Sequence, residues 1–233
     1  MGHLIIDGEH LTIKDVVDVV RKGFQVELSE EAVARVNKAR KYVDELVDNG
    51  KTVYGITTGF GKFSDTCISK EDTKELQRNL IISHACAMGE PLSEEAVRAL
   101  MLIRINALAK GCSGIRLETL NTLIDMLNKG VHPIIPEKGS LGASGDLAPL
   151  SMLILVLLGE GEAIYKGVRM PGKEAMNKAG IKPVELTSKE GLALINGTSV
   201  MTGIGALAAY DAEKLLKNAD IIAAMTLEAL RGI

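Results

Sequence analysis

The sequence predicts a mainly α-helical fold with small β elements, and three observations support this class. Hydrophobic residues make up 46% of the 233 positions but aromatic residues only 3%, so the core must be aliphatic, which favours packed helices. Long segments place apolar residues at helical spacing between capping residues and glycines. Segments that read as strands are short and lie near the N-terminus and at 163–170.

The ends of the helices are predicted from their capping residues. Thr12 and Gly23 bracket the first helix, Ser29 precedes the second, and Ser93 caps a later one that Gly111 ends. We expect helices at 13–22, 30–47, 69–87, 94–109, 116–128, 147–158, 173–179, 189–195 (capped by Ser188) and from 199 to the end. We expect strands at 4–6, 24–28, 163–165 and 168–170, and an extended connector at 132–136.

One segment, 192–210, has the apolar length of a membrane span, because it carries no charged residue. Polar residues and glycines interrupt it, however. It therefore predicts buried helix whose small residues let neighbouring backbones approach closely.

Composition excludes several classes of partner. The formal net charge of −3 gives no electrostatic case for binding nucleic acid or an anionic membrane. Three cysteines without metal-ligand spacing suit a reducing cytosol, and the first residues lack the pattern of a signal peptide. No phosphate-cradling, dinucleotide-binding or hydrolase-elbow motif is present. We expect a cytoplasmic protein with no nucleic acid, membrane or metal partner.

The chain is organised around residues 139–151, GSLGASGDLAPLS. Taken by itself, this stretch is a tight glycine-rich turn that leads into a helix. Asp146 or Ser144 can cap that helix, and Pro149 lies in a first turn that tolerates proline.

The same residues also permit a covalent rearrangement. If the Gly145 nitrogen reaches the Ala143 carbonyl carbon, a five-membered ring closes with loss of water. Loss of the Ser144 hydroxyl as a second water leaves an exocyclic methylene, which gives 4-methylideneimidazol-5-one, a strong electrophile. Gly145 has no β-carbon to block the approach and accepts strained backbone angles. Asp146 can transfer protons during ring closure.

The stretch 139–151 resembles the self-processing loop of the aromatic amino acid ammonia-lyases and aminomutases, and nothing in it departs from the family pattern. The resemblance implies that Ala143, Ser144 and Gly145 form the electrophilic cofactor, with Asp146 acting in its maturation. It also implies the ammonia-lyase fold, which is similar to that of fumarase and aspartase.

A second block, YGITTGFG at 54–61, is similar to the family's YGVNTGFG-type loop. By itself, Tyr54 reads as a partly buried tyrosine with a hydrogen-bonded hydroxyl. The resemblance implies that Tyr54 is the base toward the substrate β-proton, which requires its pKa to fall from about 10. Helix N-termini that point at the site can contribute to that shift. The departures, Ile56 and Thr57, are conservative.

A third block, QRNLIISH at 77–84, resembles the family's NLxxSH element. A lone helical histidine is more often structural, but the resemblance implies that His84 contacts the substrate side chain. Histidine ammonia-lyases carry Ser-His-Ala here, as in Ser83-His84-Ala85, whereas phenylalanine lyases generally place Phe-Leu and tyrosine lyases His-Leu. Some tyrosine aminomutases also carry a histidine. This block therefore favours histidine as the substrate without excluding tyrosine.

A fourth block contains Asn196-Gly197-Thr198, which is a turn signal by itself. It resembles the family's NGT element, whose asparagine hydrogen-bonds near the cofactor and substrate, so Asn196 is a candidate substrate-binding residue. Residues 104–116, RINALAKGCSGIR, also resemble a family block, which we interpret as scaffold.

Four blocks in the family order imply non-oxidative loss of ammonia from L-histidine to give trans-urocanate. The electrophile captures either the substrate amine or its imidazole ring. Two alternatives remain within the family: a tyrosine or phenylalanine ammonia-lyase, and a 2,3-aminomutase. An alternative of another class is a non-catalytic helical fragment that self-associates.

Relatives continue well beyond the position of Ile233, and residues 227–233 carry no helix stop signal. We therefore expect a truncated chain, with an active-site domain at 1–198 and the start of a central helical bundle at 199–233. The full-length parent is expected to be a homotetramer, whose missing parts surround the loop. Without them, we expect Ala143-Ser144-Gly145 to stay uncyclised and this chain to be inactive.

Overall fold

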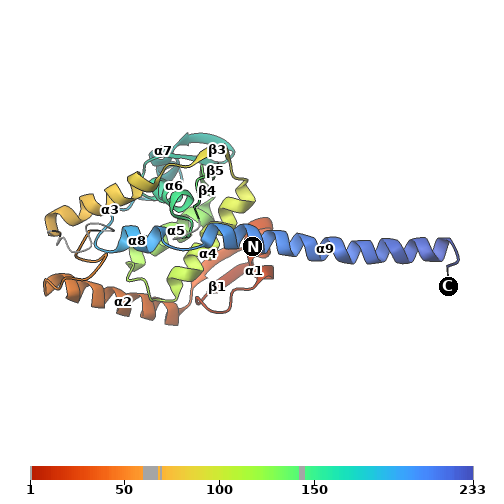
Figure 1. Cartoon of the computed structure of the whole chain (residues 1–233), viewed down its shortest axis with the longest axis horizontal. Helices are drawn as coiled ribbons and strands as arrows, with labels where there is room; N and C mark the ends of the chain where they lie inside the picture. Colours follow the sequence, from red (N-terminus) through yellow and green to blue (C-terminus); the bar gives the residue numbers. More distant parts are fainter. Residues whose placement is uncertain (1, 60–67, 69, 142–144, 233) are drawn as a thin grey trace.

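The computed structural model describes residues 2–59, 68, 70–141 and 145–232, and it confirms a mainly α-helical fold with small strands. Most elements form one body, from which the last helix projects (Figure 1). The helices are α1 (Ile13–Lys22), α2 (Glu30–Asp48), α3 (Lys70–His84), α4 (Glu94–Ala109), α5 (Leu117–Lys129), α6 (Leu147–Leu157), α7 (Gly172–Lys178), α8 (Glu190–Ile195) and α9 (Ser199–Ala229). The strands are β1 (His3–Ile6), β2 (Gln25–Leu28), β3 (Met88–Pro91), β4 (Val131–Pro133), β5 (Pro136–Lys138), β6 (Glu162–Tyr165) and β7 (Val168–Pro171).

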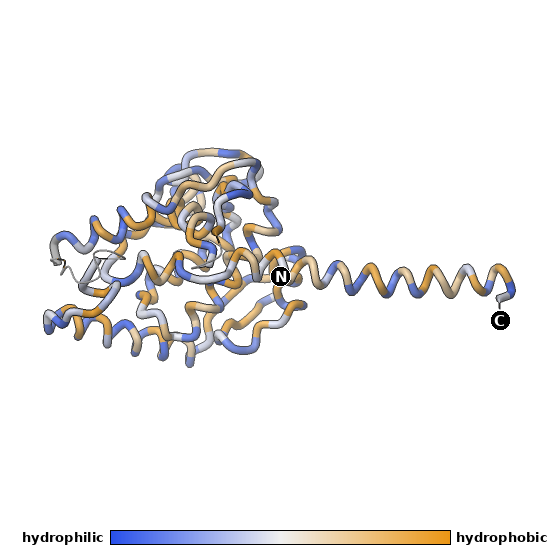
Figure 2. The backbone as a smooth tube through the Cα atoms, viewed as in Figure 1, coloured by the Kyte–Doolittle hydropathy of each residue, from blue (hydrophilic) through white to orange (hydrophobic). Residues whose placement is uncertain are grey.

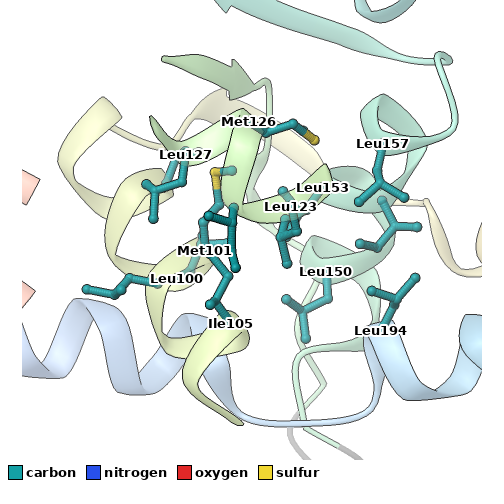
Figure 3. Close-up of a cluster of buried hydrophobic side chains, with 14 of the residues drawn as sticks. Leu100, Met101, Ile105, Leu123, Met126, Leu127, Leu150, Leu153, Leu157 and Leu194 are labelled. Carbon is teal, nitrogen blue, oxygen red and sulfur yellow. The ribbon is translucent and has the colours of Figure 1, made fainter. Parts of the chain in front are cut away.

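The core is aliphatic, as the composition requires, and it lies where α4, α5 and α6 meet (Figure 3). Leu100 and Met101 of α4, Leu123 of α5 and Leu150 of α6 are completely buried there, and Leu194 of α8 joins them. Burying such side chains contributes about 1.5–3 kcal/mol each relative to leaving them in water. This packing holds α4, α6 and α8 in fixed relative positions.

The strands form three small sheets at the edges of the helical body. β1 and β2 pair in parallel, with His3 opposite Gln25, and β4, β6 and β7 form an antiparallel sheet that includes the predicted hairpin. β3 pairs antiparallel with β5. The sequence analysis missed β3, because Met-Gly-Glu-Pro contains no strong strand former and its pairing partner lies far along the chain.

Two predicted helix ends need correction. α3 ends at His84 rather than near Ala87, and only three residues then separate it from β3. Ser188 does not cap α8: the residue before that helix is Lys189, which has a left-handed backbone with φ of 72° and makes no side-chain cap. The first helix, in contrast, is confirmed at both ends, with a complete capping box at Thr12.

α9 has two different environments along its length. Its first turns pack on α4, and a β-carbon added to Gly203 would lie 2.8 Å from the Leu100 nitrogen, so the two backbones touch closely. This confirms the predicted close approach at Gly203. The prediction that 192–210 is buried helix is wrong, because 196–198 separate α8 from α9, and Met201 and Ile204 are exposed. Further along, apolar and polar residues alternate along the helix (Figure 2). Leu215, Ile222 and Met225 there are largely exposed. Among the described helices, none is both long and apolar enough to cross a membrane.

Candidate active site

The central feature of the site is a close contact between two backbone segments that lie far apart in the sequence. Gly145 pairs with Gly197 in an isolated parallel β-bridge, and the Asp146 N–H donates to the Gly197 carbonyl oxygen at 2.7 Å. Gly145 has φ of +93°, and a β-carbon there would lie 2.6 Å from the Gly197 carbonyl carbon. Only glycine fits at this position, for reasons of both angle and space. Ala143 and Ser144 lie outside the described residues.

The Asp146 carboxylate is buried and holds the start of α9. Its Oδ2 accepts hydrogen bonds from the Val200 N–H at 2.8 Å and the Met201 N–H at 3.0 Å, and its Oδ1 accepts one from the Ser140 hydroxyl at 3.0 Å. These N–H groups belong to the first turn of α9, where a carboxylate is stabilised by unpaired donors and by the helix dipole.

Of the two predicted capping residues for the following helix, Asp146 does not cap it, and Ser144 lies outside the described residues. Asp146 occupies the N-cap position of α6, but its side chain makes no capping bond there. The third residue of α6 is Pro149, which has no N–H to donate, so one of the two usual capping donors is missing. The carboxylate bonds to α9 instead.

Asn196 is exposed and lies directly after α8, with its N–H donating to the Leu192 carbonyl at 3.0 Å. Because Gly197 follows it, Asn196 is adjacent to the bridge with Gly145. The structure thus brings together three of the predicted positions, Gly145, Asp146 and Asn196, through the backbone of Gly197.

His84 is half-buried at the last position of α3. Its Nδ1 lies 2.9 Å from the Leu80 carbonyl oxygen and 3.1 Å from the Ser83 hydroxyl. A proton on Nδ1 donates to that carbonyl, and this tautomer leaves Nε2 as an acceptor. α3 packs on α6 and α8, and a β-carbon on Gly139 would lie 2.9 Å from the α-carbon of Ala87. The backbone shortly after His84 therefore touches the start of the 139–151 stretch.

Tyr54 lies on a turn that follows α2, and 57% of its surface is exposed. The turn is shaped by Gly55, which has φ of +69°, and by the buried Thr58, whose hydroxyl accepts the Gly55 N–H at 3.3 Å. Residues 60 and 61 of the predicted loop lie outside the described part of the chain. Tyr54 and His84 thus lie on separate elements from the Gly145–Gly197 contact.

Arg104 of α4 also lies at this contact, although the sequence did not predict it as a site residue. Its side chain is buried, its Nη2 donates to the Ala193 carbonyl, and a β-carbon on Gly197 would overlap its Nη1. Burial lowers the pKa of Arg104 to about 10, so it stays charged at neutral pH. The sequence does carry a signal, since this arginine interrupts the apolar run LMLIRINAL within the block interpreted as scaffold.

Other features of the described residues do not add to this site. No group of three or more His, Cys, Asp or Glu side chains among them could hold a metal ion. An open groove of about 460 Å³ beside α3 is bordered by paired charges, including Lys74 with Glu185 and Arg78 with Glu160. None of the predicted site residues lines it.

Comparison with known proteins gives consistent matches along the chain. The profile of the aromatic amino acid lyase family matches residues 11–233. A histidine ammonia-lyase of Alkaliphilus oremlandii is 68% identical over all 233 residues, which are 46% of that relative. The chain therefore spans about half the length of the relatives it matches.

Solved structures agree with these sequence matches. The crystal structure of a histidine ammonia-lyase from Trypanosoma cruzi superposes with a TM-score of 0.93 at 43% identity, covering 98% of this chain and 45% of that one. A tyrosine aminomutase from Streptomyces globisporus gives 0.92 at 39% identity, covering 98% and 43%. The fold is thus shared by proteins whose names state different reactions.

Proposed function

We propose that this chain, which belongs to the aromatic amino acid lyase family, carries the cofactor-forming loop of an enzyme that eliminates ammonia from L-histidine to give trans-urocanate. The observation that carries this proposal is the contact of Gly145 and Asp146 with Gly197, because it fixes the C-terminal end of the Ala-Ser-Gly tripeptide. The 68% identity to a histidine ammonia-lyase supports histidine as the substrate.

The described residues fit the 4-methylideneimidazol-5-one that this family uses. In ring closure, the Gly145 nitrogen bonds to the Ala143 carbonyl carbon, whose oxygen leaves as water with the amide protons of Gly145 and Ser144. Ser144 then loses its hydroxyl and its α-hydrogen as a second water. The space around Gly145 admits no side chain, and its backbone is in a left-handed conformation. Both features suit a residue whose nitrogen must approach a nearby carbonyl. When formed, the ring supplies an electrophile for the substrate.

The chain's own residues have separate roles in this proposal. Asp146, held against α9, positions the loop and moves protons during its maturation. Asn196 hydrogen-bonds near the ring and the substrate, since it adjoins Gly197. His84 contacts the substrate side chain, and its Nε2 is suited to accept a hydrogen bond from an imidazole N–H. Tyr54 moves the substrate β-proton, and its exposure gives it access to a bound molecule.

Partners and the rest of the protein complete the proposal. Residues 1–198 form the active-site domain, 199–233 begin a helical bundle, and the full-length parent is a cytoplasmic homotetramer. The exposed apolar residues of α9 support the assembly, because such a surface is usually covered by other protein. In chain 1–233 alone, less structure surrounds the loop, so we expect the tripeptide to stay open and the chain to be inactive.

Two proteins test these statements: chain 1–233, and the same chain joined to the remaining part of the Alkaliphilus relative. Intact mass should show the sequence value for the first and a loss of two waters for the second. The fused protein should release urocanate from histidine. A fused protein of unchanged mass that releases no urocanate contradicts the proposal, and formation of a β-amino acid from tyrosine would instead support an aminomutase.

A second candidate function, of another class, is a self-associating helical fragment without catalysis. The apolar residues exposed on α9, among them Leu215, Leu216 and Met225, favour it. Sedimentation of chain 1–233 over a range of concentrations tests it: association that Leu216→Glu abolishes supports this function, and a monomer at all concentrations rejects it.

A further inference from the structure

Arg104 is a buried cation that the proposed reaction does not use. Only 4% of it is exposed, and among the described residues no ion pair joins it to a carboxylate. Its Nε, although buried, has no hydrogen-bond partner in the described part of the chain. A buried charge is costly unless neighbouring groups compensate for it. The charge of Arg104 must therefore be compensated by the polar backbone groups next to its guanidinium.

Those groups belong to the junction between α8 and α9. Nη2 donates to the carbonyl of Ala193, in the last turn of α8, where unpaired carbonyls carry partial negative charge. The α-carbon of Gly197 faces the guanidinium, since a β-carbon there would overlap Nη1 and lie 3.5 Å from Cζ. Gly197 is thus contacted from two sides. The Arg104 guanidinium lies against the Gly197 α-carbon, and the Gly197 carbonyl oxygen accepts the Asp146 N–H at 2.7 Å.

We propose that Arg104 is a positioning residue that holds the Gly197 carbonyl against Gly145 and the Asp146 N–H. A planar guanidinium can bond to the Ala193 carbonyl with one nitrogen and lie under Gly197 with another, which the single ammonium group of lysine cannot do. α4 provides a rigid base, because its core side chains are completely buried. By fixing Gly197, Arg104 fixes the end of the loop where Gly145 must be held for cyclisation. Only this last consequence rests on the proposed function.

Arg98 provides a matched control on the same helix. It is half-buried and donates to backbone carbonyls, at 2.8 Å to Val19, 3.2 Å to Val20 and 3.4 Å to Leu127, and burial lowers its pKa as well. These partners lie in α1 and α5, and not at the Gly145–Gly197 contact. Removing Arg98 therefore reports the general effect of deleting a partly buried arginine from α4.

The first measurement is hydrogen exchange of the Asp146 amide in chain 1–233, compared with Arg104→Met, Arg104→Lys and Arg98→Met. We expect exchange to accelerate about tenfold or more in Arg104→Met, the factor expected when a hydrogen bond from a charged donor is lost. Arg104→Lys should show a smaller increase, and Arg98→Met should leave the Asp146 amide unchanged. If Arg104→Met does not fold, the comparison of Arg104→Lys with the unsubstituted chain tests the proposal by itself. The proposal is overturned if the Asp146 amide exchanges at the same rate in the unsubstituted chain and in every Arg104 variant that folds.

The second measurement is the rate at which the fused protein loses two waters, followed by mass. Arg104→Met should slow this rate about tenfold or more relative to Arg98→Met, and Arg104→Lys should restore part of it. Equal rates in the two methionine variants contradict the link to cyclisation. A fused protein with Arg104 intact that never loses the waters contradicts the proposed function, while amide exchange still decides the role of Arg104.

Discussion

Replacing Asp146 with alanine should destabilise the chain far more than a typical capping mutation. The change removes one acceptor for the Ser140 hydroxyl and another shared by the Val200 and Met201 N–H groups, at a position only 5% exposed. A hydrogen bond to a charged group contributes about 1.5–3 kcal/mol, and a buried donor left without a partner costs about 1–3 kcal/mol. Since these contributions are not additive, we expect the free energy of unfolding to fall by about 3 kcal/mol in total.

Thermal unfolding provides the assay, because a domain of this size loses about 2–4 °C of melting temperature per kcal/mol. Asp146→Ala should therefore lower the midpoint by about 6–12 °C. Asp146→Asn, which keeps an acceptor oxygen, should lower it by a smaller amount.

Asp15→Ala is the matched control, since Asp15 also accepts a backbone N–H at a helix start, from Thr12 at 3.0 Å, but at an exposed site. It should cost about 1 kcal/mol or less, because water replaces the lost acceptor. If Asp146→Ala lowers the midpoint no more than Asp15→Ala does, the carboxylate does not hold α9 as described.

Three further predictions concern individual side chains, the first two in the fused protein. Tyr54→Phe should keep the fold and lower turnover by about 10²-fold or more. Steady-state kinetics close to those of the unsubstituted fused protein would show that another group is the base. His84→Phe should weaken histidine deamination and admit phenylalanine, and unchanged kinetics on histidine would remove His84 from the site. Burial lowers the pKa of His132, and nearby Arg98 adds to this while Glu94 opposes it. The unfolded chain therefore takes up the proton first, so stability should fall as pH drops below about 6.5. Urea titrations should show a shallower fall for His132→Gln, and an identical slope would refute this origin.

Local signals predicted local structure well. α1 is bounded as expected, because Thr12 and Asp15 form a capping box and Gly23 adopts the left-handed backbone that ends the helix. Each of these interactions joins residues within one or two helical turns. A single sequence therefore contains all the information that they require.

Interactions between distant segments could not be predicted in the same way. The local pattern makes Asp146 one of two candidate caps for the adjacent helix, but its partners Val200 and Met201 lie more than fifty residues away. The sequence pattern around Arg104 indicates only scaffold, because its contact with Gly197 depends on how α4 packs against the start of α9. In both cases the neighbouring residues are compatible with the observed role, but they do not predict it, because the partner lies in a distant segment.

The 31-residue α9 has a consequence for how secondary structure forms in this chain. Starting a helix in water is unfavourable, while extending one is nearly neutral. Asp146 and the buried residues Val200 and Leu207 order the first turns, so the rest of α9 grows from an existing nucleus. Asp211 still pairs with Arg21 of α1. Beyond it, the exposed turns of this helix, which is about 46 Å long, depend on residue propensities and on local pairs such as Glu213 with Lys217. Amide protection should decline from Asp211 toward Ala229, and on warming the outer turns should melt gradually before the body unfolds.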